Sequence, residues 1–249
     1  MKILIVNDDG IYSQGILTLA KRLMEDNEVL LAAPQGQMSG MGHSISFYGY
    51  VNYTELKILE GARCFAVNGT PADCVKVALN LIMEDKPDLI ISGINKGFNL
   101  GSDIFYSGTV NAALEGAVQG IKSIAVSQEY KLSNFEFTSN FIAKNLEKLY
   151  SLLPGDAQTV LNINVPNDDL SIVKGVKFSK IGVKRYCETY TFENNYGYKL
   201  RGESQLGEFN TNEDDVYLYE NNYITISAVK NDWNDYLAYD KLRKEEFEI

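Results

Sequence analysis

The stretch "KILIVNDDGI", residues 2–11, sets the expectation for the fold. It opens with a continuous apolar run, which is typical of a strand buried on both faces of a parallel sheet. The run stops at two adjacent carboxylates, Asp8 and Asp9. Like charges side by side are unfavourable unless a cation lies between them. This stretch therefore predicts a buried strand that delivers a metal site.

Outward from this strand, the chain alternates between strands and helices as far as about residue 166. Apolar runs predict the strands, and amphipathic or small-residue segments predict the helices. Such alternation indicates right-handed βαβ units and an α/β fold, with a mostly parallel sheet covered by helices on both faces. The expected strands are 2–7, 28–34, 64–68, 87–95, 123–128 and 159–166, and the expected helices are 13–25, 71–84, 107–120 and 134–152.

Beyond about residue 170 the helical pattern fades. Aromatic and β-branched residues alternate with turn formers in "YCETYTFENNYGYKLRG" (186–202) and "DDVYLYENNYITISAV" (214–229). These segments predict extended hairpins. An exposed arm rich in tyrosine would promote association if it were left uncovered, so we expect this region to make contacts between subunits.

Composition narrows the classes of function. The net charge of −10 argues against a general nucleic-acid-binding surface. Three cysteines, Cys64, Cys74 and Cys187, form no short-spaced pair, which favours a reducing compartment and argues against a cysteine-rich zinc site. No segment approaches the roughly 18 apolar residues of a membrane span. The first residues are also too short an apolar run for a signal peptide. We therefore expect a cytoplasmic protein that binds no membrane.

Chemistry is expected where the parallel strands end, because ligands of such sheets bind at the carboxyl edge. Asp8 and Asp9 lie there, and their hard oxygen donors suit Mg²⁺ or Mn²⁺ better than zinc. The alternative is that one of them only caps the helix beginning near Ser13. An N-cap uses one residue and not two, so capping alone does not explain the pair.

A glycine-interrupted segment, "QGQMSGMGHSIS" (35–46), follows the second expected strand. The Ser39 hydroxyl could bind a metal or a phosphate, and Gly40 and Gly42 would let the backbone approach a ligand closely. The single histidine, His43, also lies here. A role in acid–base chemistry and plain solvent exposure are both open for it.

The segment "SGINKGFNLGSDIFYSGTVNAALEG" (92–116) carries the most information. Asn95 ends a strand, so its carboxamide should reach the same edge as Asp8. The eleven residues 96–106 then form a loop containing Asn99 and Asp103. Long loops in compact domains are usually functional, which argues against a merely connecting role.

The same segment predicts an anion site. Ser107 is expected to be a helix N-cap, with the backbone amides of Gly108 and Thr109 pointing outward. Free N–H groups at a helix N-terminus hold a phosphate without any net positive charge, so an acidic protein can still bind one. A further turn with Thr70 and Pro71 fits ordinary capping of another helix, and substrate contact there is equally open.

Four of these segments together resemble the SurE family of stationary-phase survival proteins. They are "NDDG" at 7–10, "SG" at 39–40, "GTPADCV" at 69–75, and the long pattern SGINxGxNLGxDxxYSGTVxAAxEG at 92–116. A weaker similarity lies at Asp215 and in "NNYITIS" at 221–227. The resemblance therefore spans most of the chain, firmly to about residue 166 and loosely after it.

The resemblance implies a Rossmann-like catalytic core at residues 1–170. It also implies a C-terminal extended, hairpin-rich region at 171–249 that packs back on the core and exchanges arms in a homodimer or homotetramer. The implied activity is hydrolysis of nucleoside 5′- and 3′-monophosphates with one divalent cation per subunit, Mn²⁺, Mg²⁺ or Co²⁺. The site residues carry over as metal ligands Asp8, Asp9, Ser39 and Asn95, with Asp8 and Asn95 catalytic, and as phosphate or substrate contacts Ser39, Gly40, Asn99, Ser107, Gly108 and Thr109.

Two features stay open at this point. Met38 stands where the family usually has arginine, so one possible anion contact is missing. The nucleophile could be a metal-polarised water or Asp8 itself.

A haloacid-dehalogenase phosphatase would need an Asp-x-Asp-x-Thr pattern, which the adjacent acids do not match. A non-catalytic metal- and nucleotide-binding signalling module is the other alternative, and release of phosphate from a nucleotide distinguishes it.

Overall fold

In a computed structural model of the protein, the main sheet has nine strands in the order β3-β4-β2-β1-β5-β6-β7-β11-β8. The structure describes residues 1–132, 134–156, 158–193, 196–206, 211–232 and 234–243, without the side chains of 185, 187, 188, 203–206, 241 and 242. The six central strands are parallel, whereas β3 and β11 run antiparallel to their neighbours β4 and β7. The predicted α/β fold is confirmed.

Six strands of the first part of the chain fall close to their predicted positions. Their bounds are β1 Lys2–Val6, β2 Glu28–Pro34, β4 Arg63–Val67, β5 Leu89–Lys96, β6 Lys122–Gln128 and β7 Thr159–Val165. The short edge strand β3 (Tyr53–Leu56) was not predicted. The apolar residues of β1, β5 and β6 are fully buried, as expected of strands covered on both faces.

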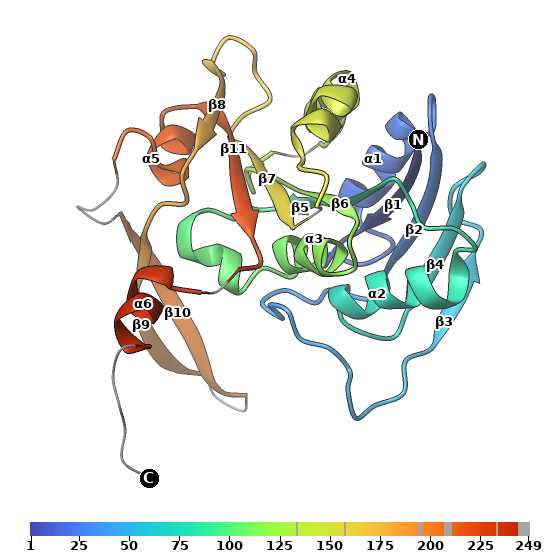
Figure 1. The fold of residues 1–249 in the computed structure, drawn as a ribbon, viewed down its shortest axis with the longest axis horizontal. Helices are drawn as coiled ribbons and strands as arrows, with labels where there is room; N and C mark the ends of the chain where they lie inside the picture. The colour runs from blue at the N-terminus through green and yellow to red at the C-terminus, as the bar shows by residue number, and fades with distance from the viewer. Residues whose placement is uncertain (133, 157, 194–195, 207–210, 233, 244–249) are drawn as a thin grey trace.

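Helices cover both faces of this sheet (Figure 1). On one face lie α1 (Gln14–Leu23) and α4 (Glu136–Leu152), and on the other lie α2 (Pro71–Val77), the π-helical turn η1 (Ala78–Ile82) and α3 (Gly108–Val118). Each layer buries its own apolar cluster against the strands. The 96–106 segment was predicted as a loop, and it contains a short 3₁₀ helix, η2 (Gly101–Phe105).

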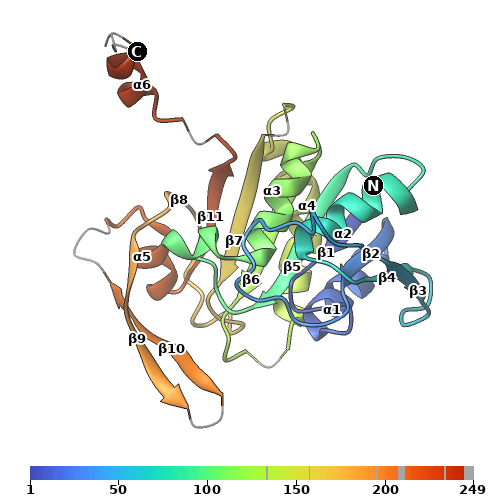
Figure 2. The ribbon, with the colours of Figure 1, turned by 90° about the horizontal axis from the view of Figure 1, so that it is seen from below.

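The C-terminal part adds two strands to the main sheet and also forms a separate two-stranded ribbon. Strands β8 (Gly175–Ser179) and β11 (Tyr223–Lys230) complete one edge of the main sheet. The antiparallel pair β9 (Lys184–Glu193) and β10 (Gly197–Leu206) forms a separate ribbon, and Figure 2 shows it projecting from the body. An extended hairpin was predicted over 214–229, and this prediction is wrong, because the segment forms the helix α5 (Asp215–Glu220) followed by β11. A second helix that the sequence pattern did not predict is α6 (Tyr236–Leu242). Both are short, so they carry little helical periodicity.

The structure also bears on two expectations from composition, which concern membrane-spanning helices and the cysteines. No helix among the described residues is long and apolar enough to cross a membrane. Cys64 and Cys74 are buried free thiols, whereas the side chain of Cys187 lies outside the described part of the chain. Burial raises the pKa of both described thiols, so they remain protonated and act as small apolar core residues.

Candidate active site

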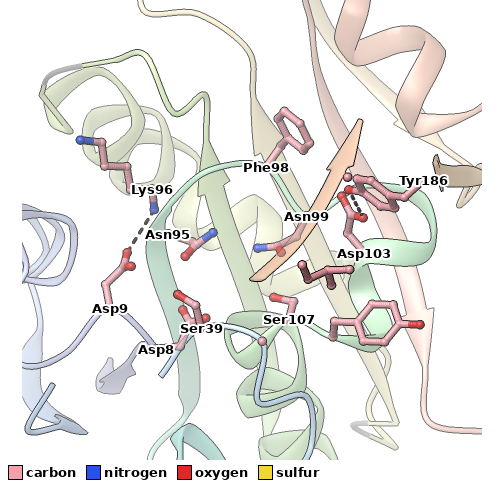
Figure 3. A pocket seen from close by; sticks show the side chains of 14 residues that line it. Asp8, Asp9, Ser39, Asn95, Lys96, Phe98, Asn99, Asp103, Ser107 and Tyr186 are labelled. Carbon is pink, nitrogen blue, oxygen red and sulfur yellow. Dashed lines mark hydrogen bonds between the residues drawn. The ribbon is translucent and has the colours of Figure 1, made fainter. Parts of the chain in front are cut away.

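A cavity of about 430 Å³ opens at the carboxyl edge of the sheet (Figure 3). It gathers residues from the ends of β1 and β5, from the loop after β2, from η2 and from the root of the β9–β10 ribbon. Seven of the nine predicted site residues line it, and Gly108 and Thr109 lie directly behind it against Asp8. The lining residues are Asp8, Asp9, Ser39, Gly40, Asn95, Lys96, Phe98, Asn99, Asp103, Tyr106, Ser107, Tyr186, Leu200 and Gly202.

The turn after β1 is shaped by Asn7, a role that the sequence pattern did not reveal. Its amide nitrogen donates to the carbonyl oxygen of Gly10 at 3.0 Å and to the hydroxyl of Ser13 at 2.7 Å, and its oxygen accepts from the Gly10 N–H at 3.2 Å. Ser13 makes no side-chain cap to α1. The N-cap position of α1 belongs to Ser13, so neither Asp8 nor Asp9 caps this helix, and the capping alternative is wrong. Both acids line the cavity.

Asp8 is only 4% exposed. The Thr109 hydroxyl donates to its Oδ1. A Cβ added to Gly108 would lie 2.7 Å from the Asp8 Cβ, so only glycine lets the start of α3 approach this closely. Burial raises the pKa of Asp8 to about 6; the Thr109 bonds lower it and the neighbouring Asp9 charge raises it. A buried acid of this kind is poised to accept a cation.

Asp9 is held by the backbone of the neighbouring strand. Its Oδ2 accepts from the Lys96 N–H at 3.1 Å. Burial raises the pKa of Asp9, and that hydrogen bond partly offsets the effect. The Lys96 ammonium lies 5.1 Å from the ring centroid of Tyr130, and Figure 3 shows it directed away from Asp9. Among the described residues, no lysine or arginine forms an ion pair with Asp8 or Asp9.

Asn95 reaches the acids because β5 is irregular just before it. The pairing of β5 with β6 shifts register between Ser92 and Asn95. Within that shift, Gly93 has a φ of +142°, and a Cβ there would lie 2.3 Å from the Val126 carbonyl oxygen. The Asn95 amide nitrogen donates to the Gly97 carbonyl oxygen at 2.8 Å. Its amide oxygen consequently points toward Asp8 and Ser39 (Figure 3).

The loop after β2 brings Ser39 over the acids. The Met38 N–H donates to the Asp8 carbonyl oxygen at 2.7 Å, which fixes the loop to the β1 turn. Gln37 donates to the Ser39 hydroxyl at 3.0 Å. Further along, His43 lies 2.9 Å from Glu115 and outside the cavity lining, so it supports the loop from the side of α3. Met38 therefore contributes to the site through its backbone N–H.

Ser107 caps α3 as predicted, accepting from the Val110 N–H at 3.1 Å. Thr109 is fully buried, and both its hydroxyl and its backbone stabilise the Asp8 carboxylate. Asn99 is tied down, since its amide nitrogen donates to the Ser127 hydroxyl at 2.8 Å. Thr70 accepts from the Asp73 N–H in a capping box and does not line the cavity. The capping interpretation of Thr70 is therefore the one that the structure supports.

The residues around the acids fit a hard divalent cation. Within the residues that the structure describes, no group of three or more His, Cys, Asp or Glu gathers, so a nitrogen- or sulfur-rich metal site is not formed. The available set is instead two carboxylates, one hydroxyl and one free amide oxygen. Such oxygen donors suit Mg²⁺ or Mn²⁺. The residues that could hold the ion are Asp8, Asp9, Ser39 and Asn95.

The buried Asp8 makes a testable contribution to stability in the metal-free protein. Its pKa is higher in the folded chain, about 6, than its ordinary value of 3.8, so the folded state binds more protons between these values. The ionised carboxylate thus costs about 3 kcal/mol above pH 6, and that cost disappears as the pH falls toward 4. In EDTA at pH 7.5, Asp8→Asn should unfold at a higher temperature than wild type.

The measurement is thermal unfolding of both proteins in EDTA from pH 4.5 to 8. The gap between the two curves should shrink as the pH falls, since the wild-type carboxylate becomes protonated. A gap that is absent or constant across this range would show that Asp8 is not an uncompensated buried charge.

The fold and this cavity define a class: α/β proteins with an acidic, oxygen-rich pocket at the carboxyl edge of a parallel sheet. Comparison with known proteins then gives the family. The profile described as "Survival protein SurE" matches residues 3–188. The chain belongs to the SurE family.

Similar proteins cover nearly the whole chain. A protein named "5'-nucleotidase SurE" from Clostridium botulinum is 38% identical over 244 residues, 95% of each chain. One of the same name from Natranaerobius thermophilus is 36% identical over the full length of both. The crystal structure of the SurE protein from Aquifex aeolicus superposes with a TM-score of 0.82 at 34% identity, covering 97% of this chain and 98% of that one.

Proposed function

We propose that this protein is a phosphatase that hydrolyses nucleoside 5′- and 3′-monophosphates to nucleoside and phosphate with one divalent cation per subunit. One observation carries the proposal: Asp8, Asp9 and the Asn95 amide oxygen share a single cavity with the capped start of α3 at Ser107. Relatives named 5'-nucleotidase support the reaction and the substrate class. An oxygen-only ligand set supports Mn²⁺, Mg²⁺ or Co²⁺ as the ion.

The proposed ligands are Asp8, Asp9, Ser39 and Asn95. When bound, the cation would neutralise charge on the phosphoryl group and lower the pKa of water. Asp8 and Asn95 are the proposed catalytic residues: the Asp8 carboxylate faces the reacting phosphorus, and the Asn95 amide orients the phosphoryl oxygens. In hydrolysis a new bond forms between phosphorus and the attacking oxygen, the bond to the leaving oxygen breaks, and the alcohol leaves with a proton from water. Asp8 either accepts the proton of an attacking water or attacks phosphorus itself, in which case water then hydrolyses the acyl phosphate and releases inorganic phosphate.

The proposed phosphate contacts are the backbone at Gly40, the Asn99 side chain and Ser107 at the start of α3. Gly108 and Thr109 were predicted as contacts with outward-pointing amides, but neither lines the cavity, and the Thr109 hydroxyl and backbone are engaged by Asp8, so these two residues support the acid instead. A helix N-terminus offers N–H groups and a positive dipole end, so it stabilises phosphoryl oxygens in an otherwise acidic protein. The cavity lining also includes aromatic and aliphatic side chains, namely Phe98, Tyr106, Tyr186 and Leu200. Their apolar surfaces provide a wall against which a nucleoside can pack.

Release of inorganic phosphate from AMP tests the proposal. The purified protein with Mn²⁺ should release phosphate, and an excess of EDTA should lower the rate by at least about a hundredfold because the phosphoryl charge is then unbalanced. Mn²⁺ added back should restore it. A nucleotide-dependent rise in unfolding temperature without any phosphate release would instead favour the signalling module.

We further propose that residues 1–170 act as the catalytic core and that 171–249 serve oligomerisation by arm exchange, as a homodimer or homotetramer. The ribbon of β9 and β10 supports this assignment, because Tyr190, Phe192 and Tyr198 are all more than 60% exposed on it. An uncovered aromatic ribbon of two strands gains stability by packing on a second chain. The free buried thiols Cys64 and Cys74 support a cytoplasmic location.

A further inference from the structure

The root of the β9–β10 ribbon is fastened to the cavity wall through one carboxylate. Asp103 lies in η2 and lines the cavity. Its Oδ2 accepts from the Lys184 ammonium at 2.7 Å. Its Oδ1 accepts from the Tyr186 hydroxyl at 2.5 Å, and Figure 3 shows these two side chains together. Lys184 and Tyr186 are two apart on β9 and so project from the same face of the strand. Both carboxylate oxygens of Asp103 are thus committed to the ribbon.

The ion pair is sheltered from water. The side chain of Lys184 is 5% exposed and that of Asp103 is 15% exposed. The Lys184 ammonium also lies 4.0 Å from the ring centroid of Phe98, another residue of the cavity wall. Lys184 itself does not line the cavity. It can therefore influence a substrate through the cavity-wall residues it contacts, which are Asp103, Phe98 and Tyr186.

A second set of contacts reinforces the same junction. The buried Asp215 carboxylate accepts from the Gly101 N–H at 3.0 Å and from the Gly182 N–H at 2.8 Å. A Cβ on Gly101 would lie 3.1 Å from the Gly182 carbonyl oxygen, so η2 and the segment before β9 are in direct backbone contact. The Ser102 hydroxyl donates to the Lys184 carbonyl oxygen. The ribbon root and η2 consequently form one packed unit.

The backbone of Asp103 connects this packed unit to the cavity wall. The Asp103 carbonyl oxygen accepts from the N–H groups of Tyr106 and Ser107, both at 3.0 Å. Tyr106 is part of the wall, and Ser107 begins α3. Asp103 therefore links the ribbon through its side chain to the wall through its backbone.

We propose that Lys184 is a positioning residue: with Asp103 and Tyr186 it fixes the wall that receives the nucleoside, and so determines how tightly nucleotides bind. This inference rests on the proposed phosphatase function. Because the acids and the ligating amide lie at the other end of the cavity, Lys184 governs affinity for the nucleoside part and not the chemical step. Lys184 is neither a proposed metal ligand nor a proposed phosphate contact.

The test compares two ligands that use different parts of the cavity. AMP contacts both the phosphate end and the wall, whereas inorganic phosphate, used as a competitive inhibitor, contacts only the phosphate end. For Lys184→Met, we expect the KM for AMP to rise about tenfold while kcat and the inhibition constant of phosphate stay within about twofold. Tyr186→Phe, which removes one hydrogen bond to Asp103 and keeps the ring, should raise KM about threefold.

The matched control is Lys180→Met. Lys180 forms a 2.5 Å ion pair with Glu213 in the same part of the chain, but both side chains are more than 60% exposed and neither lines the cavity. Its kinetic constants should equal those of wild type. Since Lys184→Met leaves a sheltered carboxylate with one partner fewer, the variant can fail to fold. In that case Tyr186→Phe tests the proposal, because Tyr186 is 38% exposed and its substitution should leave folding unaffected.

Two results would overturn the proposal. One is an unchanged KM for AMP in the folded variants. The other is a parallel change in kcat and in the phosphate inhibition constant, which would mean a general loosening of the site. A wild-type protein that releases no phosphate from AMP would overturn the proposed function itself, so the two failures are distinguishable.

Discussion

Asp8→Asn is expected to lower the rate of phosphate release from AMP by roughly a thousandfold, equivalent to about 4 kcal/mol of transition-state stabilisation. Asparagine keeps the shape of the side chain and can still accept from the Thr109 hydroxyl, so the turn after β1 is preserved. It loses the negative charge that would bind the cation and face phosphorus. The loss should therefore appear in turnover and not in folding.

The measurement is steady-state hydrolysis of AMP at saturating Mn²⁺, beside circular dichroism of the same preparation. The matched control is Asp88→Asn, an exposed carboxyl that accepts from the Lys2 N–H at 2.7 Å at the opposite edge of the sheet. That variant removes the same charge and should keep wild-type rates. A fully active Asp8→Asn enzyme would remove Asp8 from the catalytic machinery.

Asn95→Leu is expected to lower turnover about a hundredfold and to raise the Mn²⁺ concentration needed for half-maximal activity at least tenfold. Leucine has nearly the same size but offers no oxygen. In the structure, the Asn95 amide nitrogen is engaged with Gly97 while its oxygen points toward Asp8 and Ser39. That oxygen is the group whose removal should weaken cation binding.

Titrating Mn²⁺ against the rate of AMP hydrolysis separates the two possible roles of this amide. Asn80→Leu serves as the control, because Asn80 is exposed on η1 and its amide donates only to the Lys76 carbonyl oxygen at 2.7 Å. If Asn95→Leu lowered turnover while the Mn²⁺ dependence stayed as in wild type, Asn95 would orient the phosphoryl group without ligating the metal.

The sequence was most informative where local pattern and function coincide. The apolar run ending at Asp8 and Asp9, and the capped helix beginning at Ser107, each predict both an element and its role. Strand alternation then places these segments at one edge of the sheet, since carboxyl ends of parallel strands meet there. This is why residues 101 positions apart, Asp8 and Thr109, could be expected together before their hydrogen bond was seen.

Other features depend on contacts that no local pattern encodes. Asn7 is a polar residue in a turn, and its three hydrogen bonds are visible only once the turn is built. The projection of Asn95 depends on the register shift in β5. The apolar wall draws Tyr186 and Leu200 from a ribbon that lies about 80 residues or more beyond Ser107, the last of the other lining residues. Such long-range placement is decided by packing and not by propensity.

Binding of Mn²⁺ to the metal-free protein, followed by electron paramagnetic resonance of the free ion, tests the central claim most directly. We predict one tightly bound ion per chain in the wild type and a loss of at least about a hundredfold in affinity in Asp8→Asn. Wild-type affinity in that variant, or no binding in the wild type, would contradict the assignment of the cavity as a metal-dependent phosphatase site.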